Sequence, residues 1–92
     1  MNEPDHRLKE LLEAADWTDL LPRLLSYAAY RLATRGVRIG KYKKTSGQYV
    51  HRAIYEVLEG KHRYQGGTLF AFISAVTNIV IDRDLSQRKV AP

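Results

Sequence analysis

The segment that most constrains this chain runs from Tyr64 to Asp84, and it is apolar on more than one side. Its large apolar residues do not fit one narrow helical stripe: Leu69, Phe70, Phe72, Ile73, Val76, Ile79, Val80 and Ile81. A helix that is apolar most of the way round is typical of the buried centre of a small domain. Gly66 and Gly67 break the chain just before it, and Thr68 is placed to cap its first turn. We therefore expect the other segments to be amphipathic helices that pack on this one.

Three further segments have the apolar spacing of amphipathic helices. The first is residues 5–15, within an N-terminal helical region 1–16. The second is residues 19–34, in which we expect Pro22 to lie in the first turn, where an N–H has no helical partner. The third, residues 46–59, ends at Gly60, and residues 85–92 look like a frayed tail. The sequence predicts one all-α domain over residues 1–92, a small four-helix bundle.

The third segment divides into an inner and an outer face. The predicted inner stripe is Val50, Ala53, Ile54, Val57 and Leu58. The predicted outer face is Gln48, His51, Arg52, Tyr55, Glu56 and Glu59. The outer face is therefore the part of this helix that is available to a partner.

Composition and charge favour an intracellular protein with an anionic partner. The 92 residues include no cysteine, and the first residues do not form a signal peptide. The longest apolar stretch is too short to span a bilayer, so we expect a cytoplasmic protein without membrane contact. The net charge is +5, which raises the expectation of a polyanion such as nucleic acid. The alternative is that the charge serves solubility alone.

Two basic loops each carry a tyrosine, in residues 36–46 and 60–67. Cations that alternate with an aromatic ring are typical of single-stranded nucleic-acid binding, because cations meet phosphates while a ring stacks on a base. Tyr64, between Arg63 and Gln65, is the candidate for stacking. The alternative is a tyrosine that covers the end of the bundle, in a loop that is merely solvated.

Little in the sequence indicates catalytic chemistry. No two of the three histidines have metal-binding spacing on one helical face. Glu59 and His62 form only a weak candidate pair, because Gly60 ends the helix between them, and Ser26 and Ser74 have no neighbouring histidine and carboxylate. We expect no enzyme and no cofactor. Asn78, Asp82 and Arg83 form a candidate polar ridge near the end of the central helix, or else an ordinary solvated end with local pairing.

The order of three segments resembles a known family. The chain is similar to region 2 of bacterial RNA polymerase sigma factors, in particular the extracytoplasmic-function (ECF) group. The similar segments are, in order, LLPRLLSYAAYRL, SGQYVHRAIYEVLEGKHRY and GTLFAFISAVTNIVIDRD. The central helix carries the strongest likeness, with Phe72-Ile73, Val76, Asn78 and Asp82 at the family's aromatic, apolar, asparagine and aspartate places. The resemblance covers about residues 20–89.

The resemblance implies a helical domain that acts in transcription. Such a domain docks on the clamp helices of the polymerase beta-prime subunit and holds the single-stranded promoter minus-ten element. The residues that it implies for DNA binding are Lys61, His62, Arg63, Tyr64, Gln65, Asn78 and Arg83. Those that it implies for polymerase binding are Gln48, His51, Arg52 and Tyr55.

The chain also departs from the family pattern. Where the family has an acidic Asp-Leu-Val-Gln-Glu pattern, this chain has Gln48-Tyr49-Val50-His51-Arg52. The family's second, promoter-reading domain does not follow, so we expect either a fragment or a free-standing protein that pairs with a separate region-4 subunit or an anti-sigma factor. Two alternatives remain: a protein-interaction module of the same fold without polymerase binding, and a generic basic nucleic-acid-binding helical domain.

Overall fold

The computed structural model describes residues 6–36 and 46–90, and these form four α-helices without a strand. The helices are α1 (His6–Ala14), α2 (Trp17–Thr34), α3 (Ser46–Leu58) and α4 (Leu69–Val90). The prediction of a small all-α four-helix bundle is confirmed. The first basic loop, with Arg38, Lys41, Tyr42, Lys43 and Lys44, lies outside the described residues.

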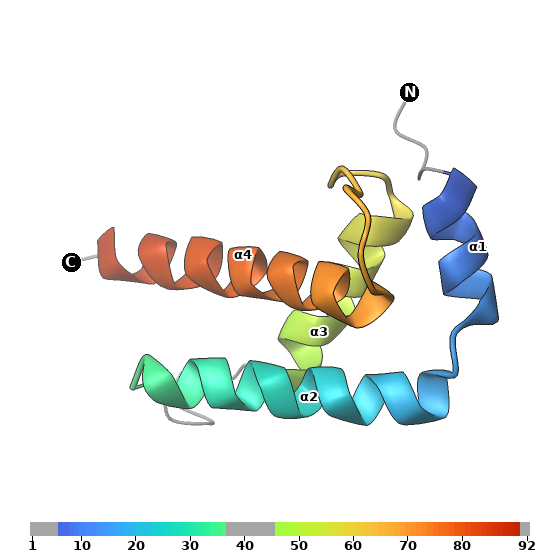
Figure 1. The fold of residues 1–92 in the computed structure, drawn as a ribbon. Helices are drawn as coiled ribbons and strands as arrows, with labels where there is room; N and C mark the ends of the chain where they lie inside the picture. Colours follow the sequence, from blue (N-terminus) through green and yellow to red (C-terminus); the bar gives the residue numbers. More distant parts are fainter. Residues whose placement is uncertain (1–5, 37–45, 91–92) are drawn as a thin grey trace.

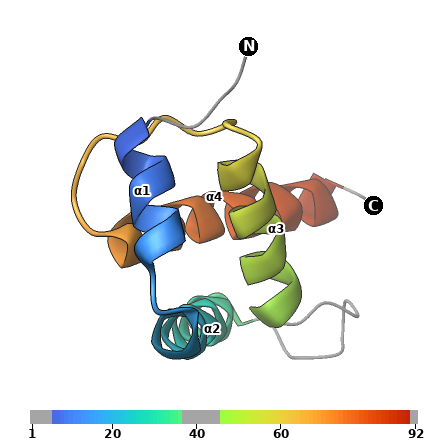
Figure 2. The ribbon, with the colours of Figure 1, turned by 90° about the vertical axis from the view of Figure 1, so that its right-hand side faces the viewer.

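The helices cross rather than run up and down as a parallel bundle. In Figure 1, α2 and α4 both start near α1 and run in the same general direction. Figure 2 shows α2 end-on while α4 lies across the view, so the two helices are splayed. In the same view α1 and α3 run in opposite directions, and α4 crosses both of them, with its start beside α1. The helix α4 contacts α1, α2 and α3, so it is the central element that the sequence predicts.

One apolar core joins all four helices. Each helix contributes fully or almost fully buried residues: Leu8 of α1, Leu24 and Ala28 of α2, Ala53 and Val57 of α3, and Ile73, Val76 and Ile81 of α4. The burial of α4 is nevertheless one-sided. Ile79 is 47 % exposed, because it points away from the line through Ile73, Thr77 and Ile81, which recur at intervals of four residues.

The helix ends follow local rules. The Thr68 Oγ1 accepts the N–H of Ala71 at 3.1 Å, which confirms the predicted N-cap of α4. Asp16 caps α2, so α2 begins at Trp17 rather than at residue 19. Pro22 consequently lies in the second turn, not the first, where its missing N–H leaves the Thr18 carbonyl without its usual helical donor.

The glycines after α2 and α3 end these helices as expected. Gly36 and Gly60 both have φ of +73°, which is costly for residues with a side chain. After α3, Gly60 N–H donates to the Val57 carbonyl and Lys61 N–H donates to the Glu56 carbonyl, each at 3.0 Å. This is a Schellman ending, and it directs the following loop back over α3.

Two residues of α3 lie on the face opposite to the predicted one. Glu56, predicted outside, is only 3 % exposed, whereas Leu58, predicted inside, is 54 % exposed. Tyr49 is also buried. The buried face of α3 is therefore rotated toward Tyr49 and Glu56, because both find polar partners outside α3, as described below.

Residues 85–90 continue α4, where the sequence predicts a frayed tail; residues 91–92 lie outside the described residues. The expected tail after residue 84 is helical as far as Val90, and Leu85 is buried against the core. Leu85 follows Ile81 by four residues, so it continues the buried line of α4. Across residues 6–36 and 46–90, no helix combines the length and apolarity needed to cross a membrane.

Candidate nucleic-acid interface

The loop that connects α3 to α4, residues 59–68, alternates between outward and inward side chains. Lys61, Arg63 and Gln65 are exposed, whereas His62 and Tyr64 between them are partly buried. Alternation of this kind is typical of an extended backbone. Of the five predicted DNA-binding residues in this loop, three are thus exposed, and the other two, His62 and Tyr64, turn toward the body of the protein.

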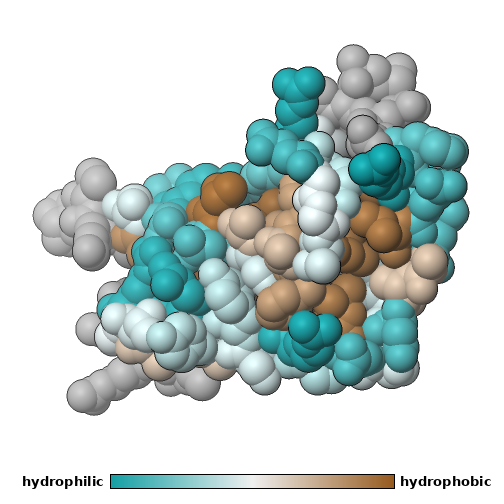
Figure 3. All heavy atoms as spheres, viewed as in Figure 1, coloured by the Kyte–Doolittle hydropathy of each residue, from teal (hydrophilic) through white to brown (hydrophobic). Residues whose placement is uncertain are grey.

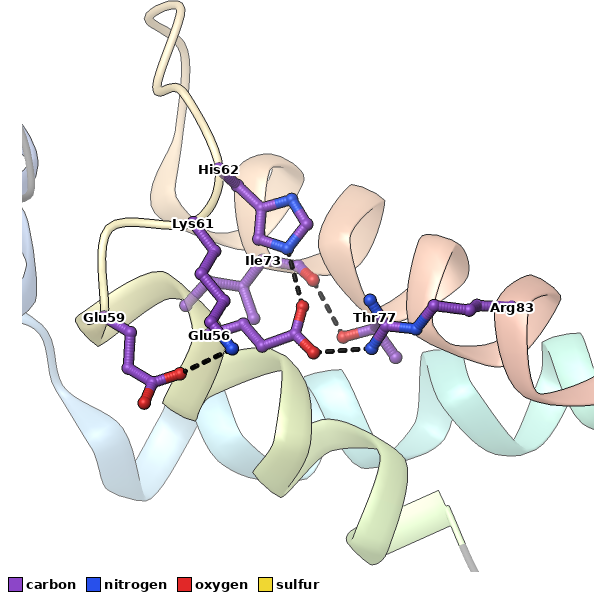
Figure 4. A network of polar contacts seen from close by, with 7 residues as sticks. All are labelled: Glu56, Glu59, Lys61, His62, Ile73, Thr77 and Arg83. Atoms are coloured by element: carbon purple, nitrogen blue, oxygen red, sulfur yellow. Dashed lines mark hydrogen bonds and ion pairs between the residues drawn. The ribbon is translucent and has the colours of Figure 1, made fainter. Parts of the chain in front are cut away.

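His62 attaches the loop to α3 and α4. Its Nε2 lies 2.8 Å from Oε1 of Glu56, while Oε2 of Glu56 accepts a hydrogen bond from Arg83 Nη2 at 2.5 Å. Figure 4 shows the Glu56 carboxylate between the two side chains, with His62 from the loop and Arg83 from α4. One buried carboxylate therefore joins α3, the loop and α4.

The pKa of Glu56 reflects this environment. Burial raises the pKa of the carboxyl, but the hydrogen bonds from Arg83 and His62, together with their positive charge, outweigh burial and hold the pKa below its ordinary value of 4.5. Glu56 is therefore ionised near neutral pH. It is a structural anion, and the sequence reasoning that placed it on the outer face missed this role.

Tyr64 forms the second attachment of the loop. Its ring packs edge-to-face on Phe72, with 5.3 Å between ring centroids, and its hydroxyl donates to the Gly67 carbonyl at 2.5 Å. Gly66 and Gly67 both have positive φ, which allows the chain to turn sharply back toward α4. Of the two alternatives for Tyr64, the structure has the tyrosine that covers the end of the bundle.

An open hollow lies beside Tyr64. It has a volume of about 550 Å³ and is lined by His6, Arg7 and Glu10 of α1 and by Tyr64, Gln65 and Gly66 of the loop. A volume of this size is within the range of small-ligand pockets. The remaining exposed edge of the Tyr64 ring is thus part of a polar hollow and not of a flat surface.

The predicted polar ridge is divided between two sides of α4. Asn78 Oδ1 accepts a hydrogen bond from Arg31 Nε at 3.1 Å and a longer one from Arg35 Nη2 at 3.5 Å. Asp82 forms an ion pair with Arg35. Asn78 and Asp82 therefore hold the end of α2 against α4, whereas Arg83 points to Glu56 on the α3 side. The Asn78 side chain is thus engaged within the fold, by two arginines of α2 and its end.

The four predicted polymerase-binding residues of α3 also separate. Gln48 and Arg52 lie next to α4, where they line a pocket with Arg83. His51 and Tyr55 are exposed on the outer side of the helix and continue to Leu58 at helical spacing. We call His51, Tyr55 and Leu58 the outer stripe. Tyr55 is 51 % exposed and Leu58 is 54 % exposed, so this stripe presents apolar surface to solvent.

Apolar surface is also visible on the opposite side. Figure 3 shows hydrophobic colour over the start of α4 and the neighbouring α1. A shallow hollow there is lined in part by Leu11, Ala15, Leu20, Leu69 and Phe70. Arg23 lies over the Phe70 ring, 4.5 Å from its centroid, and partly covers this surface.

The structure gives no support to the Glu59–His62 pair as a site. Glu59 Oε1 instead lies 3.1 Å from the Lys61 ammonium, and His62 is bound to Glu56. Within residues 6–36 and 46–90, no three His, Asp or Glu side chains are grouped so as to hold a metal ion.

Comparison with protein-family models, with curated proteins and with solved structures found no match for this chain.

Proposed function

We propose that this protein acts in transcription as a sigma-region-2-like factor that binds single-stranded promoter DNA and the beta-prime clamp helices of RNA polymerase. The observation that carries the proposal is the loop of residues 59–68, fixed at His62 and Tyr64, with Lys61, Arg63 and Gln65 directed outward. Cations on an ordered segment bind a phosphate backbone at a smaller cost in conformational entropy than cations on a flexible loop, which must become ordered on binding. Such a factor works in the cytoplasm, where the polymerase is.

The hollow beside Tyr64 supplies a place for an unstacked base. An extruded base needs a stacking surface and polar groups that read its edge. Tyr64, Gln65 and the side chains of α1 line this hollow. In this proposal Arg63 and Lys61 bind the strand, and Tyr64 is both a loop anchor and one wall of the base site.

The outer stripe of α3 is the proposed polymerase surface. Tyrosine and leucine exposed on one helical face are suited to a protein interface, where aromatic residues often contribute most of the binding energy. The carboxylates of Glu56 in α3 and of Glu59 just after it are both paired within the protein. Docking of this helix therefore depends on apolar contacts rather than on exposed acids.

A protein-interaction module without DNA binding is the second candidate. The exposed apolar side chains Tyr30 of α2 and Tyr55 and Leu58 of α3 favour it. The two candidate functions differ in a measurable property: the interaction module has no nucleic-acid binding by the loop of residues 59–68, whereas the sigma-like factor does.

We expect Arg63→Gln to weaken binding to single-stranded DNA and to reduce its salt dependence. Loss of one phosphate contact lowers the slope of log K against log salt by roughly 0.7 for a single strand. Fluorescence anisotropy with a labelled oligonucleotide, titrated at several salt concentrations, measures both effects. Double-stranded competitor is expected to bind less well.

Arg23→Gln is the matched control, since it removes the same charge from α2, where Arg23 covers Phe70 instead of facing the loop. Its salt slope is expected to equal that of the wild-type protein. A folded wild-type protein that does not bind single strands, or an Arg63→Gln slope equal to the wild-type slope, would contradict the role of the loop and favour the interaction module.

A further inference from the structure

A pocket between α3 and α4 has polar walls that no part of the proposed function uses. It has a volume of about 240 Å³, and its polar lining residues are Gln48, Tyr49, Arg52, Arg83, Asp84 and Gln87. This volume corresponds to about eight water molecules at about 30 Å³ each. The pocket therefore has room for a small polar group with its hydration, but not for a whole macromolecular segment.

Hydrogen-bond donors and positive charge dominate this pocket. Arg52 is exposed and forms no ion pair with any residue of 6–36 or 46–90. Arg83 shares one guanidinium nitrogen with Glu56, and the guanidinium carries further N–H groups. Gln48 and Gln87 add side-chain amides. Two guanidinium groups at one pocket are suited to a planar or tetrahedral oxyanion.

The first turn of α3 adds to the positive potential. Gln48 and Tyr49 belong to the first turn of α3, and this turn has no acidic residue. The N-terminal end of a helix favours negative charge. The helix end acts here together with Arg52 and Arg83, which approach the same pocket from the sides of α3 and α4.

The negative groups at the pocket are already engaged. Glu56 is buried beneath Arg83 and receives hydrogen bonds from Arg83 and His62. Asp84 Oδ2 accepts the Tyr49 hydroxyl at 2.5 Å. The Asp84 carboxylate is nevertheless a negative charge at the edge of the pocket. Removal of this charge is expected to strengthen binding of an anion in the pocket and to weaken binding of a cation.

We infer that the pocket between α3 and α4 binds one phosphate group, held by Arg52 and Arg83 with Gln48 and Gln87 at its edges. The phosphate belongs to a nucleotide or to a nucleic-acid strand, which share this chemistry. The site is separate from the loop of residues 59–68, and its existence does not depend on polymerase binding by the outer stripe.

Titration with inorganic phosphate tests the inference on the full chain. Backbone amide resonances are followed while chloride is replaced by phosphate at constant ionic strength. The expected result is a saturable shift at residues 46–49 and 83–87, with little change in the loop. Absence of a saturable shift at these residues, in a protein with a well-dispersed spectrum, overturns the inference.

Three variants make the test specific. Arg52→Gln is expected to weaken phosphate binding about tenfold or more, as one charge-assisted hydrogen bond is lost. Arg63→Gln, which removes an equal charge from the loop, is expected to leave it unchanged. Asp84→Asn retains an acceptor for Tyr49 and removes a negative charge, so it is expected to bind phosphate more tightly. Equal weakening by the two arginine variants, or weaker binding by Asp84→Asn, overturns the inference.

The source of the phosphate is resolved by two further titrations. Thymidine monophosphate and oligothymidylate are added to the wild-type protein and to Arg52→Gln. Tighter binding of the monophosphate than of inorganic phosphate identifies a nucleotide site, and tighter binding of the oligomer identifies a strand contact. In either case Arg52→Gln must lower the affinity, and an unchanged affinity for both ligands contradicts the proposed pocket.

Discussion

The Ile73→Ala protein is expected to lose about 3 kcal/mol of its free energy of unfolding. Ile73 is fully buried in α4, the helix that contacts the other three. Alanine removes apolar area and leaves a cavity that a well-packed interior refills only in part. A domain of this size has about 5–15 kcal/mol of stability, so a large share is lost. Urea denaturation followed by circular dichroism measures the change.

Ile79→Ala is the matched control for this experiment. It makes the same chemical change in the same helix, at a residue that is 47 % exposed, and its effect is expected to be within about 0.5 kcal/mol. Similar losses for the two variants would show that α4 is buried on all sides, and would contradict the one-sided core described above.

The Glu56→Gln protein is expected to lose about 2 kcal/mol, with release of the loop. Glutamine has nearly the same shape but no charge, so the hydrogen bonds to Arg83 and His62 lose their charge assistance. Since His62 attaches the loop to α3, trypsin is expected to cut the variant faster after Lys61 and Arg63. Denaturation and limited proteolysis measure the two effects separately.

Glu59→Gln serves as the control, because Glu59 pairs with Lys61 in a partly exposed position. Such surface pairs contribute at most about 1 kcal/mol. A Glu56→Gln protein with wild-type stability and wild-type trypsin resistance would show that the Glu56 carboxylate does not fix the loop.

The difference between wild type and Glu56→Gln also has a defined pH dependence. The folded-state pKa of Glu56 lies below its ordinary value of 4.5, so the unfolded protein takes up the proton first as the pH falls. The stabilisation is therefore complete above pH 4.5 and disappears as the pH falls through the lowered pKa. Comparison with the variant isolates this contribution, since the other carboxylates are common to both proteins.

The sequence predicts the helices of this protein well, because their signals are local. The four-helix count, the Thr68 cap and the glycine endings at Gly36 and Gly60 depend on spacing and on backbone preferences within a few residues. Leu85 shows the limit of this approach. It continues the four-residue spacing of the buried line, but the polar residues that follow it resemble a tail.

The face of α3 and the polar network could not be predicted in the same way. Tyr49, Ala53, Glu56 and Val57 are spaced as regularly as the predicted stripe, but the charge of Glu56 predicts an outer position, and Tyr49 belongs to neither predicted face. Their burial depends on Asp84, Arg83 and His62, which are 35, 27 and 6 residues away. Periodicity within one helix contains no information about such partners.

The candidate site was predicted in part. The charge and the tyrosine of residues 60–67 predict a basic loop, and in the structure, where the connection spans residues 59–68, Lys61, Arg63 and Gln65 are exposed. The inward orientation of His62 and Tyr64 follows from contacts with Glu56 and Phe72. The separation of Arg52 from Tyr55 likewise follows from the path of α4 along one side of α3, which no local pattern encodes.

The most direct test of the proposed function is binding of the full chain to the isolated clamp helices of the polymerase beta-prime subunit, measured by fluorescence anisotropy. We expect saturable binding that Tyr55→Ala weakens at least tenfold, in line with the loss of an aromatic residue at the centre of an interface. Ile79→Ala, on an exposed site of α4, is expected to bind as the wild-type protein does. A well-folded wild-type protein that does not bind the clamp helices would contradict the sigma-like function.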